Sequence, residues 1–133
     1  MDKNSHDSHK IATLRVYLAG TMESDWREIV KKASPRHTYY DPGIDSDQRY
    51  ACVFAQQDLA GIDGAHLVFA YETNHPVSLG TAAEMGYAFA KGKRIIYVDE
   101  RKEINLFLAS LSERTFSDLT AGIEYLTNIE ERA

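Results

Sequence analysis

The chain has 133 residues, of which 44% are hydrophobic and 26% are charged, and its formal net charge is −5. This length and composition are typical of one globular domain with an apolar core. The acidic balance and the shortness of the basic clusters argue against a polymeric nucleic-acid partner, and no apolar run is long enough to span a membrane.

The first residues are polar and lack the apolar stretch of a secretion signal. We therefore expect residues 1–12 to be disordered, residues 13–133 to form a single domain, and the protein to be cytoplasmic. Cys52 is the only cysteine and cannot form a disulfide within one chain. The histidines show no metal-ligand spacing, so the sequence predicts no metal.

Apolar runs alternate with helical patterns along the domain. The expected strands are residues 14–19, 37–40, 65–71 and 94–98, with a brief fifth strand around Phe116. The expected helices are residues 25–33, with Ser24 as the cap, 50–62, 79–90, 103–110 and 118–130. Asp41-Pro42-Gly43 predicts a turn, and a loop should follow it as far as Arg49.

The first, third and fourth strands are continuously apolar, as expected of parallel strands that are covered on both faces. The alternation of strands and helices predicts an α/β fold, a doubly wound parallel sheet of about five strands with helices on both faces. Ligands of such sheets bind beyond the carboxyl ends of the strands. Residues 17–22, 41–49 and 72–80 should therefore meet at one edge.

The segment from Ser78 to Ala88 is the most informative part of the chain, because it opens a helix that carries Glu84 near its beginning. A helix start binds anions and favours an ionised carboxylate, and Gly80 lets a ligand approach the backbone. Glu84 is a candidate nucleophile or base, although acidic residues also favour first helical turns without any function. Ser78 is either an N-cap or a group that binds a ligand's hydroxyl or phosphate.

Three further residues are candidates for the same site. Asp58 shares a helical stripe with Ile62, which places a carboxylate at the edge of a buried face, where it needs an ion-pair partner or a ligand. Tyr17 lies near the end of the first strand, where it either fills core volume or also points its hydroxyl at the crevice. Gly20 allows close approach of a ligand, or only a turn.

Three motifs resemble those of the nucleoside 2-deoxyribosyltransferase family. They are Val16-Tyr17-Leu18-Ala19-Gly20, Asp58-Leu59-Ala60-Gly61-Ile62, and Ser78-Leu79-Gly80 continued by Glu84-Met85-Gly86-Tyr87-Ala88. Their order matches the family order, and the resemblance covers residues 14–98. It implies a flavodoxin-like fold, no cofactor, a small nucleoside or nucleotide as the partner, and a homo-oligomer in which a neighbouring subunit completes the pocket.

The resemblance also implies roles for individual residues. Glu84 would attack the anomeric carbon of a 2′-deoxynucleoside and form a covalent glycosyl intermediate. Asp58 would help to protonate the departing base, and Tyr17 would orient Glu84. Ser78 and Gly80 would hold the 5′ side of the sugar.

The resemblance leaves open what accepts the sugar. In the transferases a second nucleobase accepts it; in a related branch that hydrolyses 2′-deoxynucleoside 5′-monophosphates, water accepts it and a serine six residues before the glutamate holds the phosphate. Ser78 and Glu84 have this separation. However, Glu23 would repel a phosphate, and Arg27 and Arg49 are the nearest cations to balance it. We expect deoxyribosyl transfer, with hydrolysis and a non-catalytic nucleotide-binding module as alternatives.

Overall fold

The computed structural model describes residues 10–73 and 78–132. Most of the segment predicted to be disordered, residues 1–9, lies outside these ranges. Of its remainder, Ala12 is buried and its backbone N–H donates to the carbonyl oxygen of Ile129 over 2.8 Å. The two ends of the described chain therefore lie together at the edge of the domain.

Within the described residues, five parallel strands form one sheet in the order β2-β1-β3-β4-β5. The strands are β1 (Arg15–Gly20), β2 (Thr38–Tyr40), β3 (Leu67–Glu72), β4 (Arg94–Asp99) and β5 (Arg114–Phe116). This order is the flavodoxin-like one, and the predicted fold class is confirmed. Every residue of β3 is buried, which explains why its sequence is continuously apolar.

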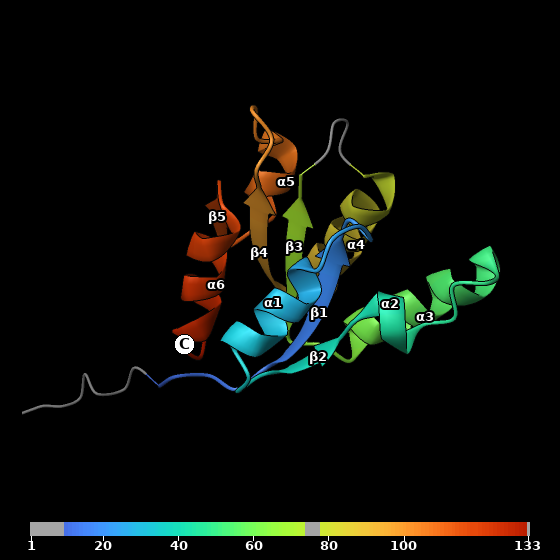
Figure 1. Cartoon of the computed structure of the whole chain (residues 1–133), viewed down its shortest axis with the longest axis horizontal. Coiled ribbons are helices and arrows are strands. Elements are labelled where there is room, and N and C mark those ends of the chain that lie inside the picture. The colour runs from blue at the N-terminus through green and yellow to red at the C-terminus, as the bar shows by residue number, and fades with distance from the viewer. Residues whose placement is uncertain (1–9, 74–77, 133) are drawn as a thin grey trace, which may run out of the picture.

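Helices cover both faces of the sheet (Figure 1). The helices are α1 (Trp26–Ala33), α2 (Pro42–Asp45), α3 (Ala51–Asp63), α4 (Leu79–Ala90), α5 (Leu106–Ser110) and α6 (Leu119–Thr127). Helices α1 and α6 pack on one face through Trp26, Val30 and Leu126. Helices α3 and α4 pack on the other face through Ile62 and Met85. The sheet thus has two separate apolar cores.

The segment after β2 differs from the prediction of a turn and a loop. Residues 42–45 form one helical turn, α2, capped by Asp41, whose side chain accepts a hydrogen bond from the backbone N–H of Gly43. Pro42 occupies the first helical position, where its fixed φ angle suits a helix and its missing N–H is not needed.

Two predicted helix starts are also wrong. Helix α1 is preceded by Asp25 at its N-cap, not by Ser24, which has a left-handed φ of 73° and so cannot start the helix. Helix α5 begins at Leu106 instead of Glu103, because the side chain of Asn105 caps it. The backbone conformation of Ser24 decides the first boundary and the hydrogen bond to Asn105 the second, and the hydrophobic pattern encodes neither.

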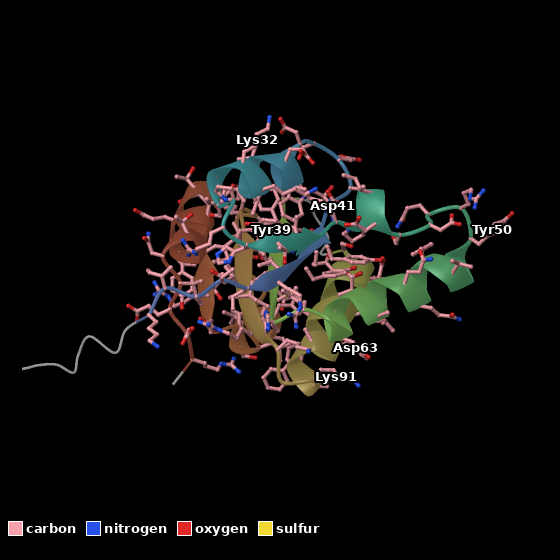
Figure 2. The ribbon with its side chains drawn as sticks, turned by 90° about the horizontal axis from the view of Figure 1, so that it is seen from below. Lys32, Tyr39, Asp41, Tyr50, Asp63 and Lys91 are labelled. Atoms are coloured by element: carbon pink, nitrogen blue, oxygen red, sulfur yellow. The ribbon has the colours of Figure 1, made fainter. Side chains whose placement is uncertain are left out.

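The start of α3 and the loop before it project from the rest of the molecule, with Tyr50 at the tip (Figures 1 and 2). Tyr50 is the N-cap residue of α3 and is 61% exposed. The later turns of α3 return to the sheet, where Ile62 is fully buried. The helix therefore has a free outer end and an anchored inner end.

Candidate active site

A cavity of about 160 Å³ lies at the carboxyl ends of β1 and β3, beside the start of α4. Its lining comes from the end of β1 and the turn after it, from α1, from α2, α3 and the segment that joins them, and from the start of α4. The lining residues are Gly20, Met22, Arg27, Pro42, Gln48, Phe54, Asp58, Ser78, Gly80, Thr81 and Glu84. The three segments that the fold prediction brings to one edge do meet here. A larger hollow of about 490 Å³ between β2 and α3 contains neither Glu84 nor Asp58.

Glu84 lies in the second turn of α4 and is held by Tyr17. The Tyr17 hydroxyl donates a hydrogen bond to Oε2 of Glu84 over 2.7 Å. Burial raises the pKa of Glu84 to about 7; the Tyr17 hydrogen bond and the charge of Arg27 oppose this rise, and the charge of Asp58 adds to it. A carboxyl with this pKa exchanges its proton near neutral pH, as groups at catalytic sites do.

Tyr17 both fills core volume and points its hydroxyl at the site. The residue has no exposed surface and belongs to the core between the sheet and helices α3 and α4. Burial, together with the neighbouring charge of Glu84, raises the pKa of the Tyr17 phenol far above its usual value. Tyr17 therefore stays protonated and acts as a hydrogen-bond donor to Glu84.

Asp58 reaches the same cavity from α3. The residue is 8% exposed, and within the described part of the chain its Oδ1 atom has no hydrogen-bond partner. Burial raises the pKa of Asp58. A buried carboxyl oxygen that lines a cavity without a partner is costly to the fold, and a ligand's N–H group would satisfy it.

The start of α4 forms another wall of the cavity. Ser78 is the N-cap of the helix, and its hydroxyl accepts a hydrogen bond from the backbone N–H of Thr81 over 3.3 Å. Gly80 follows within the first turn, and among the described residues outside the helix backbone only the Ser78 hydroxyl lies within 4 Å of where a side chain would begin. The helix start is therefore open to a ligand, and its free N–H groups favour a hydroxyl or an anion.

Arg27 lines the cavity, but its guanidinium is largely engaged by the backbone. It donates to the carbonyl oxygens of Leu18, Gly20 and Thr21 over 2.7 to 3.3 Å. Its Nε also lies 3.5 Å from Oδ1 of Asp41. Arg27 thus fixes the turn after β1 and brings positive charge close to Glu84.

The other charged residues considered from the sequence lie elsewhere. Arg49 is exposed and pairs with Asp47 over 2.8 Å, and it does not line the cavity. Glu23 is exposed and is not part of the lining either. Of the two arginines proposed to balance a phosphate, the structure brings only Arg27 to the site.

Gly20 borders the cavity, but its backbone explains why it is a glycine. Its φ is +148°, and a side chain there would overlap the carbonyl oxygen of Tyr71. The ring of Trp26 would lie only 3.1 Å away. Close packing of β1 against β3 therefore requires glycine at this position, whether or not a ligand is bound.

Several residues of the site were not predicted from the sequence. Met22 and Gln48 line the cavity from a turn and a loop, where no periodic pattern marks a side chain as inward. Phe54 lines it from α3, and its position four residues before Asp58 is a cue that the sequence analysis did not use. Glu72 is fully buried behind the cavity, and its Oε2 accepts a hydrogen bond from the backbone N–H of Ser78 over 2.9 Å. An acidic residue that ends an apolar strand is the one cue that could have identified it.

Two absences hold for the residues that the structure describes. No group of three or more His, Cys, Asp or Glu side chains among residues 10–73 and 78–132 could hold a metal ion. No helix in those ranges is long and apolar enough to cross a membrane.

The family model of the nucleoside 2-deoxyribosyltransferases matches residues 16–113, which include the whole lining of the cavity. None of the curated proteins matches the sequence.

Solved structures share the fold. A 2-deoxyribosyltransferase from Bacillus psychrosaccharolyticus is 21% identical, with a TM-score of 0.70 over 84% of this chain and 91% of that one. The CMP N-glycosidase BcmB of Clostridium botulinum is 24% identical, with a TM-score of 0.58 over 84% and 97%. A conserved protein from Enterococcus faecalis V583 is 17% identical, with a TM-score of 0.71 over 86% and 98%. At these identities the likeness shows the fold alone.

Proposed function

Because the chain belongs to the nucleoside 2-deoxyribosyltransferase family, we propose that it cleaves the N-glycosidic bond of a 2′-deoxynucleoside, or of its 5′-monophosphate, and transfers the deoxyribosyl group to another nucleobase. The observation that carries this proposal is the pair of carboxyls, Glu84 and Asp58, that reach one small cavity from different helices. Two carboxyls on either side of a glycosidic bond are what its cleavage through a covalent intermediate needs.

In the first half of the reaction, an oxygen of Glu84 attacks C1′ and the bond from C1′ to the base nitrogen breaks. The electron pair of that bond goes to the base, which takes a proton from Asp58. Tyr17 holds Oε2 of Glu84 and leaves Oε1 for C1′. The product is a deoxyribosyl ester of Glu84 and a free base.

In the second half, a nitrogen of the acceptor base attacks C1′ and displaces the Glu84 carboxylate. The acceptor loses a proton, which returns to Asp58. The charge of Asp58 adds to the rise in the pKa of Glu84, so a proton on Asp58 favours the ionised form of Glu84. A base nitrogen beside Asp58 favours the protonated form of Asp58. The electron-poor C1′ beside Glu84 favours the ionised form of Glu84.

Hydrolysis is the second candidate, and a specific observation favours it. Ser78 and Gly80 bring the open start of a helix to the cavity, and such a helix end binds phosphate. The arginine that lines the cavity, Arg27, provides positive charge, and Glu23 lies away from it. With a nucleoside 5′-monophosphate bound there, water in place of the acceptor base would release the sugar phosphate.

The product profile separates these activities. We would incubate the protein with deoxyinosine, deoxycytidine and their 5′-monophosphates, with and without an acceptor base, and identify the products by chromatography. A new nucleoside that forms only with the acceptor supports transfer, and free base that forms without it supports hydrolysis. Measurable binding of these compounds without turnover would contradict both and indicate a nucleotide-binding module.

We also propose that the protein acts as a homo-oligomer. Three large apolar side chains at the starts of α4 and α5 are exposed: Leu79 by 86%, Leu106 by 82% and Phe107 by 72%. Leu79 directly follows Ser78, so a second copy that covers this surface would lie at the edge of the cavity. Analytical ultracentrifugation of the wild-type protein should show a dimer or a larger oligomer. A Leu106→Glu, Phe107→Glu double variant should contain a larger fraction of monomer. A monomeric wild-type protein at assay concentration would contradict this.

A further inference from the structure

Tyr40, the last residue of β2, packs against the side chain that holds the proposed nucleophile. Its ring stacks on that of Tyr17, with ring centroids 5.4 Å apart and ring planes 13° from parallel. Tyr17 in turn donates the 2.7 Å hydrogen bond to Glu84. The ring of Tyr40 therefore limits how far the ring of Tyr17 can tilt, and with it the Glu84 carboxyl.

Tyr40 also contacts the turn of α3 that carries Asp58. A side chain at Gly61 would lie only 2.9 Å from three atoms of the Tyr40 ring, so the ring lies flat against the helix backbone there. The Tyr40 hydroxyl donates to the carbonyl oxygen of Gln57 over 3.2 Å. Gln57 and Gly61 are one helical turn apart, and Asp58 lies between them.

We propose that Tyr40 is a positioning residue that sets the separation of Glu84 and Asp58. The two carboxyls stand on different helices, α4 and α3, and Tyr40 is wedged between the Tyr17–Glu84 pair and the Asp58 turn. In the reaction they must act together on the two ends of one bond. A displacement of about 1 Å between groups that act together can cost about 10²-fold in rate. This inference rests on the proposed function of Glu84 and Asp58.

The neighbouring residue on β2 provides a matched control. Tyr39 points to the opposite face of the sheet, on the side of α1 (Figure 2), and packs against the core that contains Trp26 and Val30. Its hydroxyl donates to the carbonyl oxygen of Ser34 over 2.6 Å. Loss of either tyrosine ring removes a packing contact from the same strand, but of the two only Tyr40 stacks on Tyr17, the residue that holds Glu84.

The experiment compares Tyr40→Leu, Tyr40→Phe and Tyr39→Leu, each shown to be folded by circular dichroism. For base release from deoxyinosine, Tyr40→Leu should lower kcat by about 10- to 100-fold and leave KM within about threefold, because the groups remain but lose their alignment. Tyr40→Phe keeps the stacked ring and should recover most of the rate. Tyr39→Leu should lower the melting temperature without lowering kcat. An equal loss of kcat in Tyr39→Leu and Tyr40→Leu would overturn the proposal.

Crystal structures of the same variants give a readout that does not need turnover. In Tyr40→Leu the distance from the Tyr17 hydroxyl to Glu84 Oε2 should lengthen from 2.7 Å, and in Tyr39→Leu it should not. An unchanged distance and an unchanged position of Asp58 in Tyr40→Leu would contradict the positioning role. If the wild-type protein releases no base, the proposed function fails, and this structural comparison still decides whether Tyr40 holds the pair.

Discussion

Asp99 at the end of β4 and the two acids of the cavity, Asp58 and Glu84, are acids at least half buried near the carboxyl edge of the sheet, and the fold shifts their pKa values in opposite directions. At the end of β4, Asp99 is fully buried, and its carboxylate accepts hydrogen bonds from the Tyr97 hydroxyl, the Arg101 guanidinium and the backbone N–H of Asn105. Burial alone would raise the pKa of Asp99, but the bonds from Arg101 and Tyr97 outweigh it and lower the pKa to about 2.

The acids of the cavity are stabilised less: Glu84 accepts a hydrogen bond from the Tyr17 hydroxyl, but burial outweighs that bond. Burial raises the pKa of both Glu84 and Asp58, and Oδ1 of Asp58 has no partner among the described residues. Asp99 is a structural carboxylate whose hydrogen-bonding capacity is used by the protein itself. On the proposed function, Oδ1 of Asp58 and the second oxygen of Glu84 are left for a ligand, at a cost to the stability of the fold.

The largest effect should come from removal of the proposed nucleophile. Glu84→Ala should lower kcat/KM for base release by at least about 10³-fold, because no covalent intermediate can form. The measurement is chromatographic release of hypoxanthine from deoxyinosine. Glu124→Ala, an exposed acid on α6, is the control and should keep the full rate. Near-normal activity of Glu84→Ala would remove Glu84 from the mechanism.

Disruption of the Asp99–Arg101 ion pair should change the stability of the protein and not its activity. Arg101→Met leaves Asp99 buried without its cation, and loss of one partner of a buried pair costs about 3 kcal/mol. Denaturant unfolding at pH 7 should show this loss, while the activity per folded molecule stays within a few-fold. The difference in unfolding free energy between variant and wild type should narrow as the pH falls towards 2, because Asp99 of the variant, without Arg101, takes up a proton at a higher pH than Asp99 of the wild type. A rate loss as large as that of Glu84→Ala would erase the distinction between the two groups.

The sheet could be predicted from the sequence because its signal is local and strong. The runs in β1, β3 and β4 are continuously apolar, and parallel strands buried on both faces are the structure that such runs form. The placement of Glu84 and Asp58 at one edge then follows from right-handed crossovers. The predicted helix over residues 79–90 agrees with α4 at both ends, and Ser78 is its N-cap, one of the two roles considered for it from the sequence.

The remaining features depend on contacts between distant segments. No spacing in the sequence shows that Tyr40 stacks on Tyr17. Nor does any spacing show that the Arg27 guanidinium donates hydrogen bonds to three backbone carbonyl oxygens. Phe54 enters the cavity from the projecting half of α3, whose hydrophobic pattern continues that of the buried half. Such residues are recruited by tertiary geometry, and their types alone do not distinguish them from ordinary surface or core positions.

A smaller effect on rate should separate the second acid from the first. Asp58→Asn cannot protonate the departing base and should slow base release from deoxyinosine by about 10²-fold. With 7-methyl-2′-deoxyguanosine, whose base already carries a positive charge, the same variant should lose less than about tenfold. Glu84→Ala should show the same loss of rate, at least about 10³-fold, with both substrates. Equal losses of Asp58→Asn on the two substrates would show that Asp58 does not act as the acid.

The smallest predicted effect is on stability alone, and it compares the ionisation of Glu84 with that of Asp99. The pKa of Glu84 is about 7 in the folded chain, above its ordinary value of 4.5, so the folded state binds this proton more tightly than the unfolded state. Ionisation of Glu84 therefore lowers stability, with no loss at pH 4 and the full loss above pH 7. Gln keeps the size of the side chain and a carbonyl oxygen for the Tyr17 hydroxyl, but it cannot ionise.

Glu84→Gln should accordingly unfold like wild type at pH 4 and be more stable at pH 8. One pKa unit corresponds to about 1.4 kcal/mol, and because Glu84 is partly exposed we expect a gain of about 1 kcal/mol. Asp99→Asn should change in the opposite direction at pH 8, since it loses a carboxylate that the fold stabilises. Thermal melts of both variants across this pH range measure the two signs. A loss of stability in Glu84→Gln at pH 8 would mean that the fold favours the ionised form of Glu84, as it does that of Asp99.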